Sequence, residues 1–184
     1  GVTFDNSLGS CAFCCPSRAT YLTGQYAHEH GVWGNAAPNG GYYKLDSTNT
    51  LPVWLQRAGY QTIHIGKYLN GYGTRNAIEV PPGWGLWYGS VDPTTYRFYN
   101  YTLNENGKTV NYGTGTGNYQ TDVYAQKAVN LIAAQAADPQ RPHRLTRECP
   151  SGAFLDFLER APARKCRAHR RRHLQRLECV RDGE

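Results

Sequence analysis

Two short segments of the chain carry side chains that could act on an anion. The first reads Cys14-Cys15-Pro16-Ser17-Arg18 and continues to a Leu-Thr-Gly that ends at residue 24. A cysteine at the start of a helix lies beside main-chain N–H groups that attract anions, and an arginine four residues later shares its helix face. The second segment places Lys67 directly after an apolar run. These residue types indicate nucleophilic chemistry on a bound anion.

Both segments require secondary structure that holds them in place. Pro16 suits the first turn of a helix and Gly24 suits its left-handed end, so we predict a helix between them. A second helix is predicted from an N-cap at Thr50 to an end at Gly59. The β-rich run over residues 60–65 then predicts a buried strand that ends close to Lys67. A helix followed by a strand is half of an α/β unit.

The remaining chain predicts four further features. Asn106-Gly107 is a strong hairpin signal, and Thr121 can cap a long helix with one apolar face. The expected features are a strand over residues 2–7, a loop over 31–41, a hairpin of strands 96–103 and 108–112, and a helix that starts at Thr121.

Composition divides the chain into two parts. Residues 1–140 carry eight basic and eight acidic side chains, whereas residues 141–184 carry twelve basic and six acidic ones and so hold the whole net charge of +6. All 14 tyrosines and all four tryptophans lie in the first part, and arginine dominates the second. The charge of the chain is therefore weak support for nucleic-acid binding, and no apolar run is long enough to suggest a membrane span.

The first segment resembles the signature of the sulfatase family, Cys-x-Pro-Ser-Arg followed by Leu-Thr-Gly. Residues 59–69 resemble the second sulfatase signature, a Gly-Tyr-x-Thr strand that ends in Gly-Lys. Residues 67–73, 80–84 and 97–102 are similar to the branch of N-acetylglucosamine-6-sulfatases and bacterial arylsulfatases. The resemblance implies an α/β fold, a partial alkaline-phosphatase-like α/β/α sandwich without its first strand and its later strands.

The resemblance also implies a mechanism and a partner. A maturation enzyme would oxidise Cys14 to formylglycine, whose hydrate attacks the sulfur of a sulfate ester and later expels sulfate. Arg18 would hold that hydrate, and Lys67 would contact a sulfate oxygen. A divalent cation, usually Ca²⁺, would bind residue 14 and polarise the sulfate. The substrate would be a sulfated small molecule or glycan, and a secreted or periplasmic location would fit glycan substrates.

Parts of the family pattern are missing from the chain. The family's Asp-Asp metal ligands would precede Gly1, its Asp-Asn or Asp-His ligands would lie far downstream, and no buried strand follows the last predicted helix. We therefore predict a partial N-terminal catalytic domain over residues 1–140 and a basic tail over 141–184 that is out of frame or disordered. The chain alone is expected to be inactive, with no membrane or nucleic-acid partner.

Alternative interpretations remain for several residues. The chain could be a non-catalytic remnant or a binding module whose Arg170-Arg171-Arg172 run contacts nucleic acid or another anion. The tail residues Cys166, His169 and His173 have a spacing similar to zinc ligands, without a paired Cys-x2-Cys. His28 and His30 could line a pocket or be structural, and His64 is expected to be packed in the interior. Cys11 and Cys15 are expected to be structural or incidental.

Overall fold

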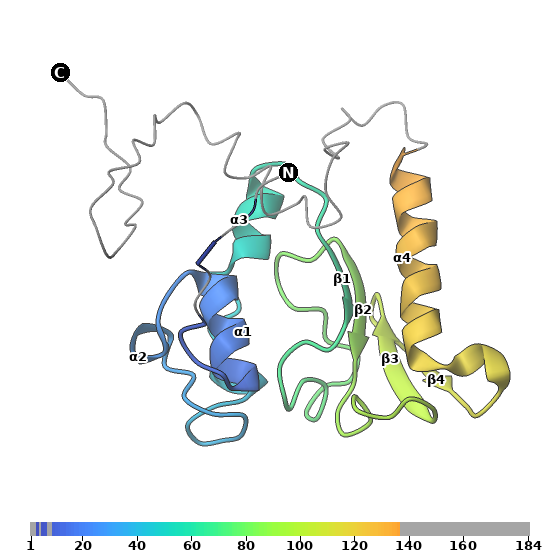
Figure 1. Cartoon of the computed structure of the whole chain (residues 1–184), viewed down its shortest axis with the longest axis horizontal. Coiled ribbons are helices and arrows are strands. Elements are labelled where there is room, and N and C mark those ends of the chain that lie inside the picture. The colour runs from blue at the N-terminus through green and yellow to red at the C-terminus, as the bar shows by residue number, and fades with distance from the viewer. Residues whose placement is uncertain (1–2, 4, 7–8, 137–184) are drawn as a thin grey trace. The chain divides into compact units, whose positions relative to one another are not determined.

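A computed structural model of the chain describes residues 3, 5–6 and 9–136, all of which belong to one unit that spans residues 2–140. Its four strands form a mixed sheet in the order β1-β2-β3-β4 (Figure 1). The first pair is parallel and the other two pairs are antiparallel. The strands are β1 (Ile63–Gly66), β2 (Leu86–Ser90), β3 (Tyr101–Glu105) and β4 (Lys108–Tyr112).

Four α-helices accompany the sheet. Figure 1 shows the sheet between α4 on one side and α1 with α3 on the other, which is an α/β/α arrangement. This agrees with the predicted α/β class. The helices are α1 (Cys14–Thr23), α2 (Ala27–His30), α3 (Leu51–Arg57) and α4 (Gln120–Ala136), and short 3-10 turns lie at Tyr42–Lys44 and Thr116–Asn118.

Of three predicted signals at helix ends, one is confirmed. Gly24 ends α1 in the left-handed conformation with φ of 70°, and its N–H donates to Thr20 O at 2.8 Å. The long helix α4 begins at Gln120, so Thr121 lies inside its first turn and the predicted cap at Thr121 is wrong. Thr50 occupies the N-cap position of α3, but its hydroxyl donates to Ser47 O at 3.3 Å, so the predicted side-chain cap is wrong.

The parallel pair β1–β2 differs from the prediction in two ways. The predicted strand over residues 60–65 is shorter, because pairing begins at Ile63 opposite Leu86. Thr62 O accepts hydrogen bonds from both Gly85 N and Leu86 N at 3.0 Å just before the pair starts. Strand β2 was not predicted, because its five residues lie in a stretch rich in Gly, Pro and Tyr and carry no clean alternation.

The predicted hairpin is confirmed, with a first strand that is shorter than expected. Strands β3 and β4 pair from Tyr101 with Tyr112 to Glu105 with Lys108. Asn106 and Gly107 have φ of 52° and 89°, the positive pair that a two-residue hairpin turn requires. Asn106 also reaches the neighbouring strand, because its Oδ1 accepts the N–H of Trp87 at 2.8 Å. The turn therefore fixes β2 as well as β3 and β4.

The strand predicted over residues 2–7 is wrong for its described residues. Thr3, Asp5 and Asn6 have no strand assignment, and the sheet of β1 to β4 includes none of them. A strand needs a partner to satisfy its backbone groups, and the described part of the chain offers these residues none.

The core is unusually aromatic. Trp87, Tyr68 and Tyr72 are almost fully buried and meet one another edge to face at ring distances of 5.1–6.1 Å. His64 stacks on Trp87 at 4.4 Å, which confirms that it is packed in the interior. Removal of water from the His64 ring lowers its pKa to about 4.

None of the described helices combines the length and the apolar character that are needed to cross a bilayer.

Candidate active site

Cys14 is the first residue of α1, so its side chain lies beside the unpaired N–H groups of that helix. The preceding residue, Phe13, offers no side-chain cap. Asn35, from the loop after α2, replaces it, because its Oδ1 accepts the N–H of Cys15 at 2.8 Å. A distant asparagine therefore caps the helix that presents the thiol.

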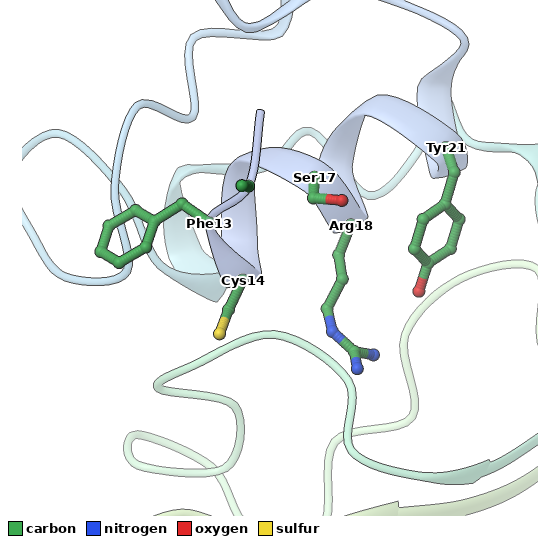
Figure 2. Close-up of a pocket in the computed structure, with 6 residues that line it drawn as sticks. Phe13, Cys14, Ser17, Arg18 and Tyr21 are labelled. Atoms are coloured by element: carbon green, nitrogen blue, oxygen red, sulfur yellow. The ribbon is translucent and has the colours of Figure 1, made fainter. Parts of the chain in front are cut away.

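Arg18 lies one turn along the same helix. Figure 2 shows its side chain and that of Cys14 extending from the same side of α1. The guanidinium Nη1 donates to the main-chain oxygen of Lys67 at 2.8 Å. This bond connects α1 to the chain that leaves β1, so the arginine fixes the position of the lysine backbone.

Lys67 follows directly after Gly66, the last residue of β1. Its Nζ donates to Tyr96 Oη at 2.5 Å and lies 4.6 Å from the centroid of the Tyr96 ring. Partial burial on its own would lower the pKa of Lys67, but hydrogen bonds with Tyr96 and Cys14 outweigh it, so the pKa is raised. The ammonium therefore stays charged at neutral pH.

The charge of Lys67 acts on Cys14. Hydrogen bonding with Lys67 is the largest influence on the pKa of the Cys14 thiol and lowers it, against a smaller opposing effect of burial. Asn35 and Tyr96 lower this pKa further by hydrogen bonding. The half-buried thiol is thus held in a site that stabilises negative charge.

Cys15 has a different role from its neighbour. Its side chain is completely buried, and burial raises the pKa of its thiol. Its Sγ accepts the N–H of Asn70 at 3.1 Å and lies 3.4 Å from Asn70 Oδ1. The Asn70 amide in turn donates to Tyr96 Oη at 2.9 Å. The prediction that Cys15 is structural is confirmed, since it anchors a residue that contacts the site.

A shallow hollow of about 320 Å³ opens beside the thiol (Figure 2). Two aromatic side chains, Phe13 and Tyr21, stand on its rim and are each 51% exposed. The hollow thus combines one cation, one thiol and two exposed rings. Its lining residues are Ala12, Phe13, Cys14, Ser17, Arg18 and Tyr21.

The structure brings the three predicted site residues, Cys14, Arg18 and Lys67, close to one another, although 49 residues separate the last two. Three further residues belong to the same network: Asn35, Asn70 and Tyr96. The sequence reasoning missed them. Asn70 follows the Gly-Lys signature by three residues and could have been found from it, whereas Asn35 and Tyr96 lie in loops without any local signal.

In the described part of the chain, His28, His30 and Cys11 make no hydrogen bond or ring contact with Cys14, Arg18 or Lys67 and lie outside this network. His30 Nε2 lies 3.2 Å from Thr20 Oγ1, and its Nδ1 accepts the N–H of Val32 at 3.1 Å. His28 stacks on Tyr26 at 5.9 Å. Neither histidine lines the hollow, and the two hydrogen-bond contacts of His30 favour a structural role for that residue. Cys11 is a free thiol without a disulfide.

The described residues do not provide a complete metal site. Within residues 3, 5–6 and 9–136 there is no group of three or more His, Cys, Asp or Glu side chains that could hold a metal ion. The side chains that act on Cys14 are those of Lys67, Asn35 and Tyr96, and none of these three is a carboxylate. The predicted zinc-like residues and the arginine run of the tail lie outside the described residues.

Comparisons with known proteins agree with this geometry. The family profile described as Sulfatase matches residues 1–146, which extends past the boundary that we expected at residue 140. The human N-acetylglucosamine-6-sulfatase is 40% identical over 141 residues, which are 72% of this chain and 25% of that protein. The Volvox carteri arylsulfatase is 38% identical over 141 residues, which are 74% of this chain and 21% of that protein. This chain therefore spans about a quarter of the length of these relatives.

A solved structure supports the fold. It is described as a protein in complex with its substrate D-glucosamine-2-N,6-O-disulfate, and it shares 30% identity and a TM-score of 0.55 with this chain. The match covers 75% of this chain and 24% of that one. The predicted α/β fold and the predicted resemblance are both confirmed. The family profile matches most residues of the chain, and Cys14, Arg18 and Lys67 lie together near the end of β1. This chain therefore belongs to the sulfatase family.

Proposed function

We propose that the described residues form the nucleophile-bearing part of an active site that hydrolyses sulfate esters, with Cys14 as the precursor of formylglycine. The observation that carries this proposal is the convergence of Cys14, Arg18 and Lys67 at the start of α1 and the end of β1. Three residues from the two sequence signatures are therefore close together, at the start of a helix and the end of a strand, where an anion is favoured.

The two cations have separate tasks in this proposal. Lys67 holds its charge beside residue 14 and binds an oxygen of the sulfate group. A guanidinium has five N–H donors, and within the described residues Arg18 directs only one hydrogen bond to a protein partner, Lys67 O. Its remaining donors are available to the hydrated side chain at position 14. Because both cations are held by neighbouring residues before the substrate arrives, little reorganisation is needed.

We further propose that the substrate is a sulfated amino sugar. Human and Bacteroides thetaiotaomicron relatives are named for sulfatase action on N-acetylglucosamine-6-sulfate groups. The exposed rings of Phe13 and Tyr21 beside the thiol provide apolar surface on which a sugar ring can pack. Residues 1–140 are accordingly proposed as the catalytic part of the chain.

A divalent cation, Ca²⁺ by family, would supply polarisation of the sulfate group. Residue 14 would contact it, and its other ligands would have to come from outside the described residues, which hold no cluster of three ligating side chains.

Conversion of Cys14 tests the proposal directly. The chain is co-expressed with a formylglycine-generating enzyme, and the peptide that contains residue 14 is weighed. We expect a loss of about 18 Da at Cys14 as the thiol becomes an aldehyde. The variant Cys14→Ala must lose this change while Cys11 stays a thiol. An unaltered Cys14, under conditions in which the same enzyme converts a known sulfatase peptide, would contradict the proposal.

A further inference from the structure

We propose that Tyr96 is a positioning residue of this site, whose hydroxyl holds the Lys67 ammonium beside residue 14. Its importance for sulfate ester hydrolysis rests on the function proposed above, whereas the contact itself can be tested without that function.

Tyr96 comes from the segment between β2 and β3, far in sequence from both catalytic signatures. Its Oη accepts hydrogen bonds from Lys67 Nζ at 2.5 Å and from Asn70 Nδ2 at 2.9 Å. Its ring is 62% exposed, and the ammonium lies 4.6 Å from the ring centroid. An exposed tyrosine that gathers two donors of an anion-binding site is better explained by the site than by packing.

The hydrogen-bond capacity of a phenol makes the arrangement directional. A tyrosine hydroxyl can both accept and donate hydrogen bonds. Here its oxygen accepts from both Lys67 Nζ and Asn70 Nδ2, so it brings the lysine ammonium and the amide to one point. The variant Tyr96→Phe would keep a ring near the ammonium but could accept neither hydrogen bond.

The lysine needs such an anchor. Its ammonium sits on a flexible four-carbon stem, and the ordering of that stem costs conformational entropy. Arg18 fixes only the main chain of Lys67, through its carbonyl oxygen. Tyr96 fixes the other end, the ammonium itself. Together the two residues hold both ends of the lysine side chain before any substrate binds.

The test uses the unconverted 184-residue chain and the thiol of Cys14 as a reporter. Iodoacetamide labelling is followed at one fixed pH, and tandem mass spectrometry separates Cys14 from buried Cys15. The variant Tyr96→Phe keeps the ring over the ammonium and removes only the hydroxyl. We expect Cys14 to be labelled about fivefold more slowly, the size of one lost hydrogen bond. Labelling of Cys11 and the thermal unfolding of the variant should not change.

Two comparisons show whether Tyr96 acts through the lysine. Tyr99→Phe, a change to a tyrosine in the same segment whose ring contacts that of Tyr119, should leave the labelling rate of Cys14 unchanged. In a double-mutant cycle, Tyr96→Phe should have little further effect on the labelling rate of Cys14 when Lys67→Met is already present. The inference would be overturned if Cys14 in Tyr96→Phe were labelled at the rate of the parent chain. It would also be overturned if the effects of Tyr96→Phe and Lys67→Met on the labelling rate multiplied in the double variant. A failure of Cys14 conversion would instead contradict the proposed function and leave this result intact.

Discussion

At the residue scale, the chemistry of Cys14 depends on side chains that come from three distant segments. Its own helix supplies unpaired N–H groups, while Lys67, Asn35 and Tyr96 supply the hydrogen bonds that lower the pKa of its thiol. Cys15, one residue away, has a raised pKa because it faces the interior. The two adjacent cysteines therefore differ in the pKa of their thiols, because one side chain points toward the site and the other toward the interior.

His64 provides a prediction at this scale. Its pKa in the folded chain is about 4, below the ordinary value of 6.5, so the unfolded chain binds a proton more readily. The stabilisation is fully present above pH 6.5 and is lost as the pH falls toward 4. We expect the free energy of unfolding in urea to fall by an amount on the order of 2–3 kcal/mol through this group between pH 7 and pH 4.

The variant His64→Phe isolates that contribution, because it keeps an aromatic ring against Trp87 without a titrating group. Its free energy of unfolding should depend on pH less than that of the parent chain across this range. His28→Phe, a change to an exposed histidine, serves as the matched control. An equal pH dependence in His64→Phe and the parent chain would show that His64 is not the responsible group.

At the element scale, the turn of the β3–β4 hairpin contacts a third strand, β2. Asn106 accepts the N–H of Trp87 with its side chain and donates its own N–H to Trp87 O, both at 2.8 Å. The turn thereby attaches the hairpin to β2, which pairs in turn with the strand that leads to Lys67. A local turn signal thus contributes to the placement of a site residue on another strand.

Gly107 gives a prediction for this hairpin turn. Its φ of 89° is unfavourable for a side chain, although the nearest atom to an added Cβ, Ile78 O, is 3.8 Å away. The change Gly107→Ala should therefore lower the free energy of unfolding by about 1 kcal/mol through backbone strain alone. Gly117→Ala is the control, since that glycine has open space around it and no positive φ. Equal stability of the two variants, measured in urea, would contradict the argument from φ.

At the scale of the whole molecule, the described residues bring the two cations of the proposed site close to Cys14 but do not gather a set of side chains that could hold a metal ion. The chain spans about a quarter of the length of its curated relatives, and the described residues hold no cluster of three ligating side chains. The helix α4 also presents apolar side chains to solvent, with Val129 and Ile132 each 60% exposed.

The lack of a cluster of metal-ligating side chains in the described residues predicts how the purified chain binds Ca²⁺ and whether it turns over a sulfate ester. After conversion of Cys14, we expect weak Ca²⁺ binding by calorimetry and no turnover of an aryl sulfate or of N-acetylglucosamine-6-sulfate. The reason is that a hard divalent cation requires about six oxygen ligands, more than residue 14 can offer. A full-length sulfatase assayed in parallel shows that the assay works. Turnover by this chain, abolished by a chelator and restored by Ca²⁺, would contradict the prediction.

The sequence by itself determined the family, because short signatures encode it in consecutive residues, and it predicted Cys14, Arg18 and Lys67 as the residues of the proposed site. It also determined the hairpin turn and the end of α1, since positive φ at Gly24 and at Asn106-Gly107 is a local property of those residue types. Only the tertiary structure decided that Asn35 caps α1, that Tyr96 and Asn70 reach Lys67, and that β2 pairs with β1. Those contacts join residues that are 20 to 29 positions apart in the sequence, and no local preference of a loop residue specifies which distant atom it will meet.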